Sequence, residues 1–291
     1  MGMGIVAGLK SGLAALAVCA IAMPALADGM DKKKSLKDAP AEEPKRDLQI
    51  TANAAATSEY VFRGFSQSAE RPAWQVGVDV TYKWFYVGAW GSLIDFGTDG
   101  NFPEKDVAHT EIDYYAGIKP VVGPVTLDIG VIYYSYPRAR DGVPFANSEF
   151  DYVEVKFGAS GEIWKDATLS GTVFYSPEYT NKTGAVWTAE GTLTQVLPKL
   201  RDITPSISGT LGYQAGDDLR FQALIGNGAD DYLYWNVGLG LGFGDRFSLD
   251  FRYWDTNVKD NNANAGFTDG FCTGKVFQCD ERFVATAKVT Y

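Results

Sequence analysis

Histidine occurs once in the 291-residue sequence, as His109. Hydrolytic and lipid-modifying enzymes commonly use a histidine as the general base for a Ser or Cys nucleophile. No G-x-S-x-G motif, which would mark a nucleophile elbow, accompanies His109. A solvated loop histidine explains the residue better than catalysis does, so we predict no enzyme and no catalytic residue. Chemistry carried by carboxylates alone remains open, because the sequence pairs none of them.

Two other patterns lack the spacing that ligand binding needs. Cys272 and Cys279 are seven residues apart with no histidine nearby, which is not the spacing of a zinc site. The glycines of 238–244 alternate as G-x-G-x-G-x-G inside an apolar segment, whereas a phosphate-binding loop reads G-x-G-x-x-G before a helix. We therefore predict no cofactor and no metal, and we interpret these glycines as a slim, hydrated face.

Charged side chains that alternate with apolar residues form the remaining chemical pattern. Such charges could tune ion selectivity, although for any single residue a salt bridge inside a lumen is the simpler expectation. The predicted inward acids are Asp79, Glu111, Asp113, Asp128, Glu154, Glu190 and Asp250, and the inward bases are Lys119, Lys156, Arg252, Arg282 and Lys288. Acids exceed bases in this set, which favours a weak preference for cations.

The elements that position these charges are most evident between residues 232 and 255. Large apolar residues occupy every second position of 233–243 and again of 247–253, with Gly244-Asp245 between the two runs. Period two indicates a strand with one apolar face, and so short a glycine-bearing break indicates a hairpin. An apolar face about ten residues long, opposite glycine and polar residues, is typical of a strand with lipid outside and water inside.

The same pattern recurs along the chain and predicts an all-β fold, a transmembrane antiparallel up-and-down β-barrel of twelve strands. Short connections (83–84, 121–123, 161–165, 198–202, 244–245) alternate with longer ones, as expected for periplasmic turns and extracellular loops. Twelve strands predict a narrow pore. The predicted strands lie near 48–58, 73–83, 84–95, 109–119, 124–136, 150–160, 166–176, 185–197, 203–213, 232–243, 246–256 and 281–291.

The segment before the barrel has the features of an exported chain. Residues 1–27 carry one charge, an apolar run and a small-x-small site at 25–27, which predicts a cleaved secretory signal peptide. Residues 28–47 are charged and contain proline, which predicts a flexible periplasmic segment, and 48–291 form the barrel. In an exported chain Cys272 and Cys279 are expected to form a disulfide.

The chain resembles a known family, the TorF-type porins of Gram-negative bacteria. The resemblance rests on SEYVFRGFSQ at 58–67, YVGAWGS at 86–92 and GDRFSLDFRYWD at 244–255, and it extends over about 48–291. It implies an outer-membrane barrel with pore activity, and it implies no substrate and no catalytic residue.

Together these patterns predict a narrow passive channel in the Gram-negative outer membrane for small hydrophilic solutes or ions. The alternative is a closed structural or adhesive barrel that binds partners through its extracellular loops. Outer-membrane lipid is the expected surroundings, and the final strand, ending on Tyr291, is expected to engage the barrel-assembly machinery. A formal net charge of −10 argues against nucleic acid as a partner.

Overall fold

The computed structural model describes residues 48–99, 102–141, 149–225, 229–258, 272 and 274–291. The predicted signal peptide (1–27) and charged segment (28–47) lie outside the described residues. Parts of the predicted loops 96–108, 137–149, 214–231 and 257–280 lie outside them as well.

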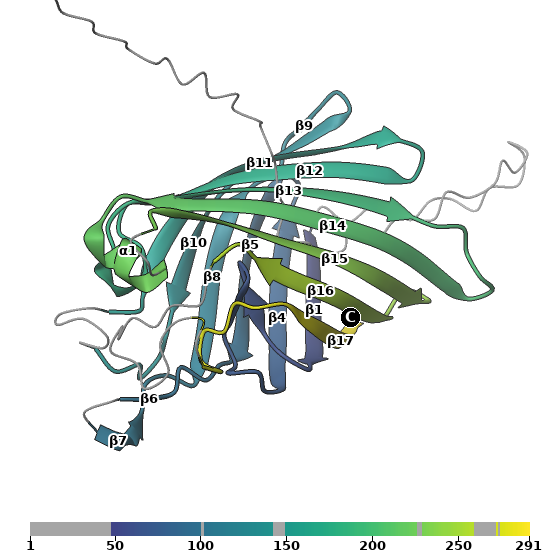
Figure 1. Cartoon of the computed structure of the whole chain (residues 1–291). Coiled ribbons are helices and arrows are strands. Elements are labelled where there is room, and N and C mark those ends of the chain that lie inside the picture. The colour runs from purple at the N-terminus through teal and green to yellow at the C-terminus, as the bar shows by residue number, and fades with distance from the viewer. Residues whose placement is uncertain (1–47, 100–101, 142–148, 226–228, 259–271, 273) are drawn as a thin grey trace, which may run out of the picture.

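Twelve long antiparallel strands of the described chain close into a barrel, which confirms the predicted fold class (Figure 1). Each strand pairs with the next in the sequence, β10 pairs with β11, and β17 returns to pair with β1. The strands are β1 (Leu48–Thr57), β4 (Ala73–Tyr82), β5 (Phe85–Leu93), β8 (Thr110–Ile118), β10 (Val125–Ser135), β11 (Tyr152–Trp164), β12 (Ala167–Ser176), β13 (Val186–Val196), β14 (Ile203–Gly216), β15 (Asp231–Phe243), β16 (Phe247–Thr256) and β17 (Arg282–Thr290).

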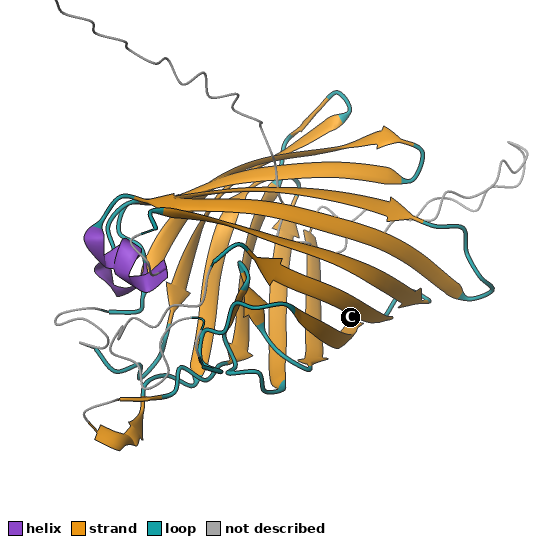
Figure 2. Cartoon of the chain, viewed as in Figure 1, coloured by secondary structure: helices purple, strands orange, loops and turns teal. Residues whose placement is uncertain are grey.

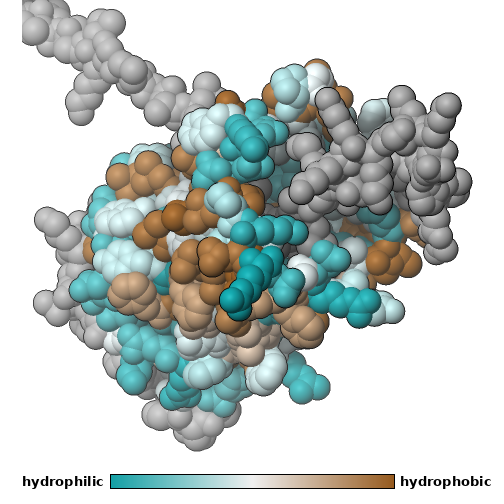
Figure 3. Space-filling model, turned by 90° about the vertical axis from the view of Figure 1, so that its right-hand side faces the viewer, coloured by the Kyte–Doolittle hydropathy of each residue, from teal (hydrophilic) through white to brown (hydrophobic). Residues whose placement is uncertain are grey.

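Along these strands, side chains point alternately to an apolar exterior and to a polar interior. On β4, for example, Trp74 and Val76 are 67% and 59% exposed, while Gln75 and Asp79 between such positions are partly shielded. The same parity holds on β15, where Val237 and Leu239 face outward. Apolar residues also gather in the middle of the face that Figure 3 shows, beside hydrophilic residues. A barrel with this apolar belt can only be stable with its exterior in a non-aqueous medium.

The connections differ at the two ends of the barrel, which we call the turn end and the loop end. The loops contain short elements that the sequence pattern did not predict: β2 (Val61–Phe62) with β3 (Phe65–Ser66), β6 (Thr98–Asp99) with β7 (Phe102–Asp106), η1 (Thr180–Lys182) and α1 (Leu219–Ile225). Figure 2 shows α1 and the β6–β7 hairpin at the same end of the barrel. At the turn end, β9 (Val121–Val122) extends one hairpin.

One predicted turn is wrong. Residues 161–165 are predicted as a connection, but β11 continues to Trp164 because Gly161, Glu162 and Trp164 pair with β12 across a β-bulge. The predicted loop 214–231 also begins too early, because residues 214 and 215 pair with β15 and β14 ends at Gly216. A bulge interrupts the period of two locally, which hides the end of the strand from an alternation argument. No helix in the described part of the chain is long and apolar enough to cross a membrane.

Candidate functional site

The interior is organised in rows that run across three neighbouring strands. In each row a long side chain lies over a central residue and reaches an acceptor two strands away. Tyr115 on β8 crosses Gly88 on β5 and donates its hydroxyl to Asp79 Oδ1 on β4 at 2.6 Å. A hydrogen bond that skips a strand in this way requires the concave side of the sheet, so these residues line the lumen.

Two further rows have the same construction on the opposite wall. Tyr234 on β15 crosses Gly212 and donates to Glu190 on β13. Arg252 on β16 crosses Gly238 and donates from Nη2 to Ser208 Oγ at 3.0 Å.

The central residue of each row is glycine because any side chain there would collide with the group above it. A Cβ on Gly88 or Gly212 would overlap the tyrosine ring, and on Gly238 it would lie 2.8 Å from the Arg252 guanidinium carbon. Of the glycines in 238–244, which are predicted to form a slim hydrated face, Gly238 therefore differs from the prediction because the Arg252 side chain lies over it. At Gly88, Gly212 and Gly238 a long side chain covers the glycine, so the lumen is narrower there than the glycines alone suggest.

Five of the predicted inward acids accept a hydrogen bond from a tyrosine hydroxyl. Besides Asp79 and Glu190, Asp128 accepts from Tyr86 at 2.7 Å, Glu111 from Tyr60 at 2.7 Å and Glu154 from Tyr134 at 3.1 Å. Asp128 also binds Lys156 Nζ at 2.9 Å, with Lys119 Nζ at 3.7 Å. The tyrosine hydrogen bonds fix these carboxylates against the barrel wall. The two lysines offset the charge of Asp128.

The loop end of the lumen is filled by the β2–β3 hairpin, which we call the plug. The hairpin turns at Arg63-Gly64, both with positive φ (49° and 90°). A Cβ on Gly64 would overlap Thr256 Cγ2 and lie 3.1 Å from Tyr234 Cβ, so only glycine fits between the turn and the barrel wall. Ser66 N donates to Gln278 O at 2.9 Å and Tyr232 OH to Arg63 O at 3.2 Å, which hold the plug to the surrounding loops and wall.

Arg63 anchors the plug to the far wall. Its Nη1 and Nη2 atoms donate to Glu154 Oε1 and Oε2 at 2.7 and 2.8 Å, and the two side chains are 3% and 1% exposed. The guanidinium also lies 4.7 Å from the ring centre of Phe62 and 4.9 Å from that of Phe174. Burial alone would disfavour its charge, but the Glu154 carboxylate outweighs burial and raises the pKa of Arg63 above its usual range.

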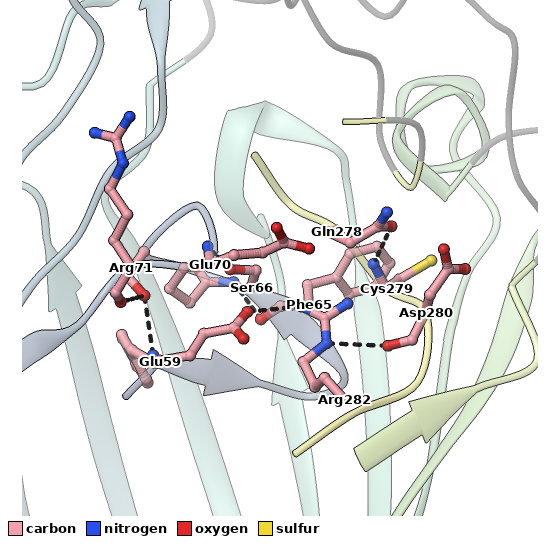
Figure 4. A network of polar contacts seen from close by, with 12 residues as sticks. Glu59, Phe65, Ser66, Glu70, Arg71, Gln278, Cys279, Asp280 and Arg282 are labelled. Carbon is pink, nitrogen blue, oxygen red and sulfur yellow. Dashed lines mark hydrogen bonds and ion pairs between the residues drawn. The ribbon is translucent and has the colours of Figure 1, made fainter. Parts of the chain in front are cut away.

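Other polar contacts hold residues beside the plug and the adjacent loop in place. Burial, and then the charge of Glu111, raise the pKa of Tyr60 well above its usual range, so the Tyr60 hydroxyl remains a donor. Figure 4 shows Arg282 on β17 directed at Glu59, with Nη1 2.7 Å from Oε1. Cys272 and Cys279 are joined by a disulfide in the adjacent loop. Thr256 Oγ1 donates to Cys279 O at 3.0 Å, so this loop is fastened to β16.

Burial of the inward residues changes along the barrel axis. On β12, inward Thr168 at the turn end is exposed, Ser170 is intermediate, and Thr172 and Phe174 are buried. Gln49 and Thr51, which line the turn end on β1, are exposed. The lumen is therefore open to water at the turn end and filled at the loop end.

The remaining predicted inward residues occupy the same surface. Asp250 accepts from Arg252 Nε and Nη2 at 3.0 and 2.9 Å, which pairs these two charges within one strand. Asp113 lies near Glu111 on β8, and its buried Oδ1 atom has no hydrogen-bond partner among the described residues. Lys288 on β17 has intermediate burial.

Sequence reasoning missed the plug and its charges. Arg63 and Glu59 lie in a segment predicted to be an outer loop, where alternation gives no direction. The signal that could have indicated an inward segment is the run 58–67 itself, because it combines aromatic residues with Arg-Gly, an unusual composition for a hydrated loop.

The structure also shows the surroundings of His109 and of the residue types that could bind a metal ion. His109 is exposed, and its Nε2 lies 2.9 Å from Asp106 Oδ2, as in an ordinary contact between surface side chains. Within the described residues, no cluster of three or more His, Cys, Asp or Glu could hold a metal ion.

A closed barrel with an apolar belt and a polar, charged interior defines a β-barrel of the membrane-spanning class. The chain belongs to the Gcw_chp family, described as a bacterial protein of unknown function, whose model matches residues 41–291. No curated protein matches the sequence significantly.

Among solved structures, the chain is similar to KdgM porin (9% identity, 83% of this chain and 98% of that chain, TM-score 0.47) and NanC porin (9%, 83% and 98%, 0.46). It is also similar to outer-membrane expressed OmpT of Vibrio cholerae (9%, 84% and 97%, 0.37).

Proposed function

We propose that this protein is an outer-membrane porin of the TorF type, a narrow passive channel for small hydrophilic solutes or ions with weak cation preference. The observation that carries the proposal is the polar, charged lumen inside an apolar belt, which is open to water at the turn end. Acids outnumber bases among the charges that line it, and a lumen of one net sign raises the local concentration of counter-ions.

The plug is the constriction in this proposal. Solutes that enter from the loop end must pass the β2–β3 hairpin, whose hold on the wall is dominated by Arg63 and Glu154. We infer that transient movement of the hairpin sets the conductance. The proposal therefore predicts small, infrequent steps for the wild type.

The test is the conductance of purified, folded protein in a planar lipid bilayer. The matched variant replaces Val61–Ser66 with a Gly-Ser linker of equal length, which removes the plug and leaves the twelve strands intact. Stepwise conductance that increases in the variant supports the channel. Absence of conductance in both proteins, each shown to be folded by heat-modifiable gel migration, overturns it.

A closed barrel that binds partners through its loops is the second candidate. The observation that favours it is the filled loop end, where Tyr134, Phe174 and Tyr234 are almost completely buried. Under this proposal the plug-free variant stays non-conducting or loses its fold.

Placement in the outer membrane rests on the same belt together with the predicted signal peptide. We propose that the chain is exported, that its mature periplasmic segment is flexible, and that β17 is recognised by the barrel-assembly machinery. Cell fractionation with a periplasmic and an outer-membrane marker tests the location.

A further inference from the structure

A cavity of about 70 Å³ lies at the loop end, between the plug and the loops that cover it. Its walls come from segments far apart in the sequence. Arg63 belongs to the plug, Tyr179 and Asn181 to the loop after β12, and Phe221 and Leu224 to α1. Aromatic rings form most of this wall, and Phe150 contributes another.

Two polar atoms of residues that line this cavity are buried without a hydrogen-bond partner, Arg63 Nε and Asn181 Oδ1. Both residues are buried, at 4% and 3% exposure. The first atom is a donor and the second is an acceptor, and leaving either unpaired in a dry site is costly. Both residues also have positive φ (49° and 60°), a backbone conformation that costs energy for residues other than glycine.

The charge of the cavity is balanced before any guest enters. Glu154 already occupies both Nη atoms of Arg63. The free donor therefore belongs to a neutralised ion pair, and a charged guest would have no counter-charge in this aromatic surrounding.

The size of the cavity limits the guest. A single water needs about 10–15 Å³ on this scale, so about five to seven waters, or a solute with that number of non-hydrogen atoms, would fill the cavity. Hydroxyl groups can both accept from Arg63 Nε and donate to Asn181 Oδ1, while carbon-bound hydrogens contact the rings. We propose that this cavity is a binding site for a small uncharged polyol of about three carbons. This proposal does not require that the barrel conducts.

The test is saturation-transfer NMR on the folded full-length protein in detergent, with three probes that share a three-carbon frame. Glycerol is neutral, glycerate is an anion and 2-amino-1,3-propanediol is a cation, and erythritol adds a longer neutral polyol. We expect saturation transfer to glycerol and at least about tenfold weaker affinity for the two charged probes. Erythritol, which is larger than the cavity, should bind more weakly than glycerol.

Variants distinguish this cavity from other surfaces. Asn181→Gly keeps the positive φ accessible and removes the acceptor, so affinity for glycerol should fall about tenfold. Leu224→Trp fills the cavity and should abolish binding. Gly123→Ala, at a turn with no atom within 4 Å of the added Cβ, is the control and should bind as the wild type does.

Each other result overturns the proposal. If neutral polyols give no saturation on the folded wild type, the cavity holds only water. If Leu224→Trp and Asn181→Gly both bind glycerol with wild-type affinity, the probe binds elsewhere. Equal affinity for the three charge types contradicts the argument from the neutralised ion pair.

Discussion

Removal of the Arg63 guanidinium should release the plug. In Arg63→Met the Glu154 carboxylate keeps only the Tyr134 hydroxyl at 3.1 Å, in a site where its side chain is 1% exposed. Breaking one side of a buried ion pair costs about 3–5 kcal/mol, because the remaining charge is neither paired nor hydrated. Glu154 lies on β11, which is hydrogen-bonded to a strand on each side, so movement of the hairpin hydrates Glu154 at a lower cost than movement of the wall.

The substitution therefore destabilises the plugged state relative to the open state and leaves the stability of the barrel nearly unchanged. A shift of about 3–5 kcal/mol at about 1.4 kcal/mol per tenfold change raises the ratio of open to plugged protein by about 10²- to 4 × 10³-fold. In a planar bilayer this should appear as longer open dwell times and larger mean conductance. Strand content and urea midpoint of the barrel should change little.

The matched control removes both charges. Arg63→Met combined with Glu154→Leu leaves no unpaired charge, so the plug should return and conductance should fall toward the wild-type value. If the single and the double variants have the same conductance as the wild type, the ion pair does not hold the plug and the reasoning is refuted.

Four further changes test other parts of the structure. Gly64→Ala should displace the plug by its contact with Thr256 and increase conductance, whereas Gly123→Ala should cost only about 1 kcal/mol of local strain in urea unfolding. Leu239→Arg on the lipid face should cost about 2–4 kcal/mol in vesicle-based urea titrations, while lumen-facing Gly242→Ser should be tolerated, and the reverse ranking would contradict the facing assignment. Cys272→Ser should loosen only its own loop, by about 2.5 kcal/mol at most, measured as faster proteolysis there with an unchanged barrel. Asp128→Asn frees Lys156 and Lys119 and should move the reversal potential in a KCl gradient toward anions; a move toward cations would refute the charge argument.

The sequence alone determined the barrel. Alternation along segments such as 232–243 sets which side chains face lipid, and it needs no knowledge of distant residues because the strand period is a local property. The alternating lengths of the connections then follow from up-and-down topology. For the same reason the predicted strand ends lie close to the observed ones, except at β11, where a bulge changes the local period, and at β14, which continues three residues beyond 213 to Gly216.

Alternation along the strands also predicted that the charged residues face the lumen. It did not predict their hydrogen-bond partners. The hydrogen bonds from Tyr115 to Asp79 and from Tyr234 to Glu190 join residues 36 and 44 positions apart. Which tyrosine crosses which glycine depends on the register of three strands, and register between strands is set by the closed sheet.

Only the tertiary structure decided the state of the loop end. Arg63 and Glu154 are separated by 91 positions, and nothing in the sequence around either residue indicates the other. A loop segment has no fixed period, so its direction depends on what the completed barrel leaves for it to fill. The plug and the cavity beside it exist because closure of the sheet brings these segments to one end of the lumen.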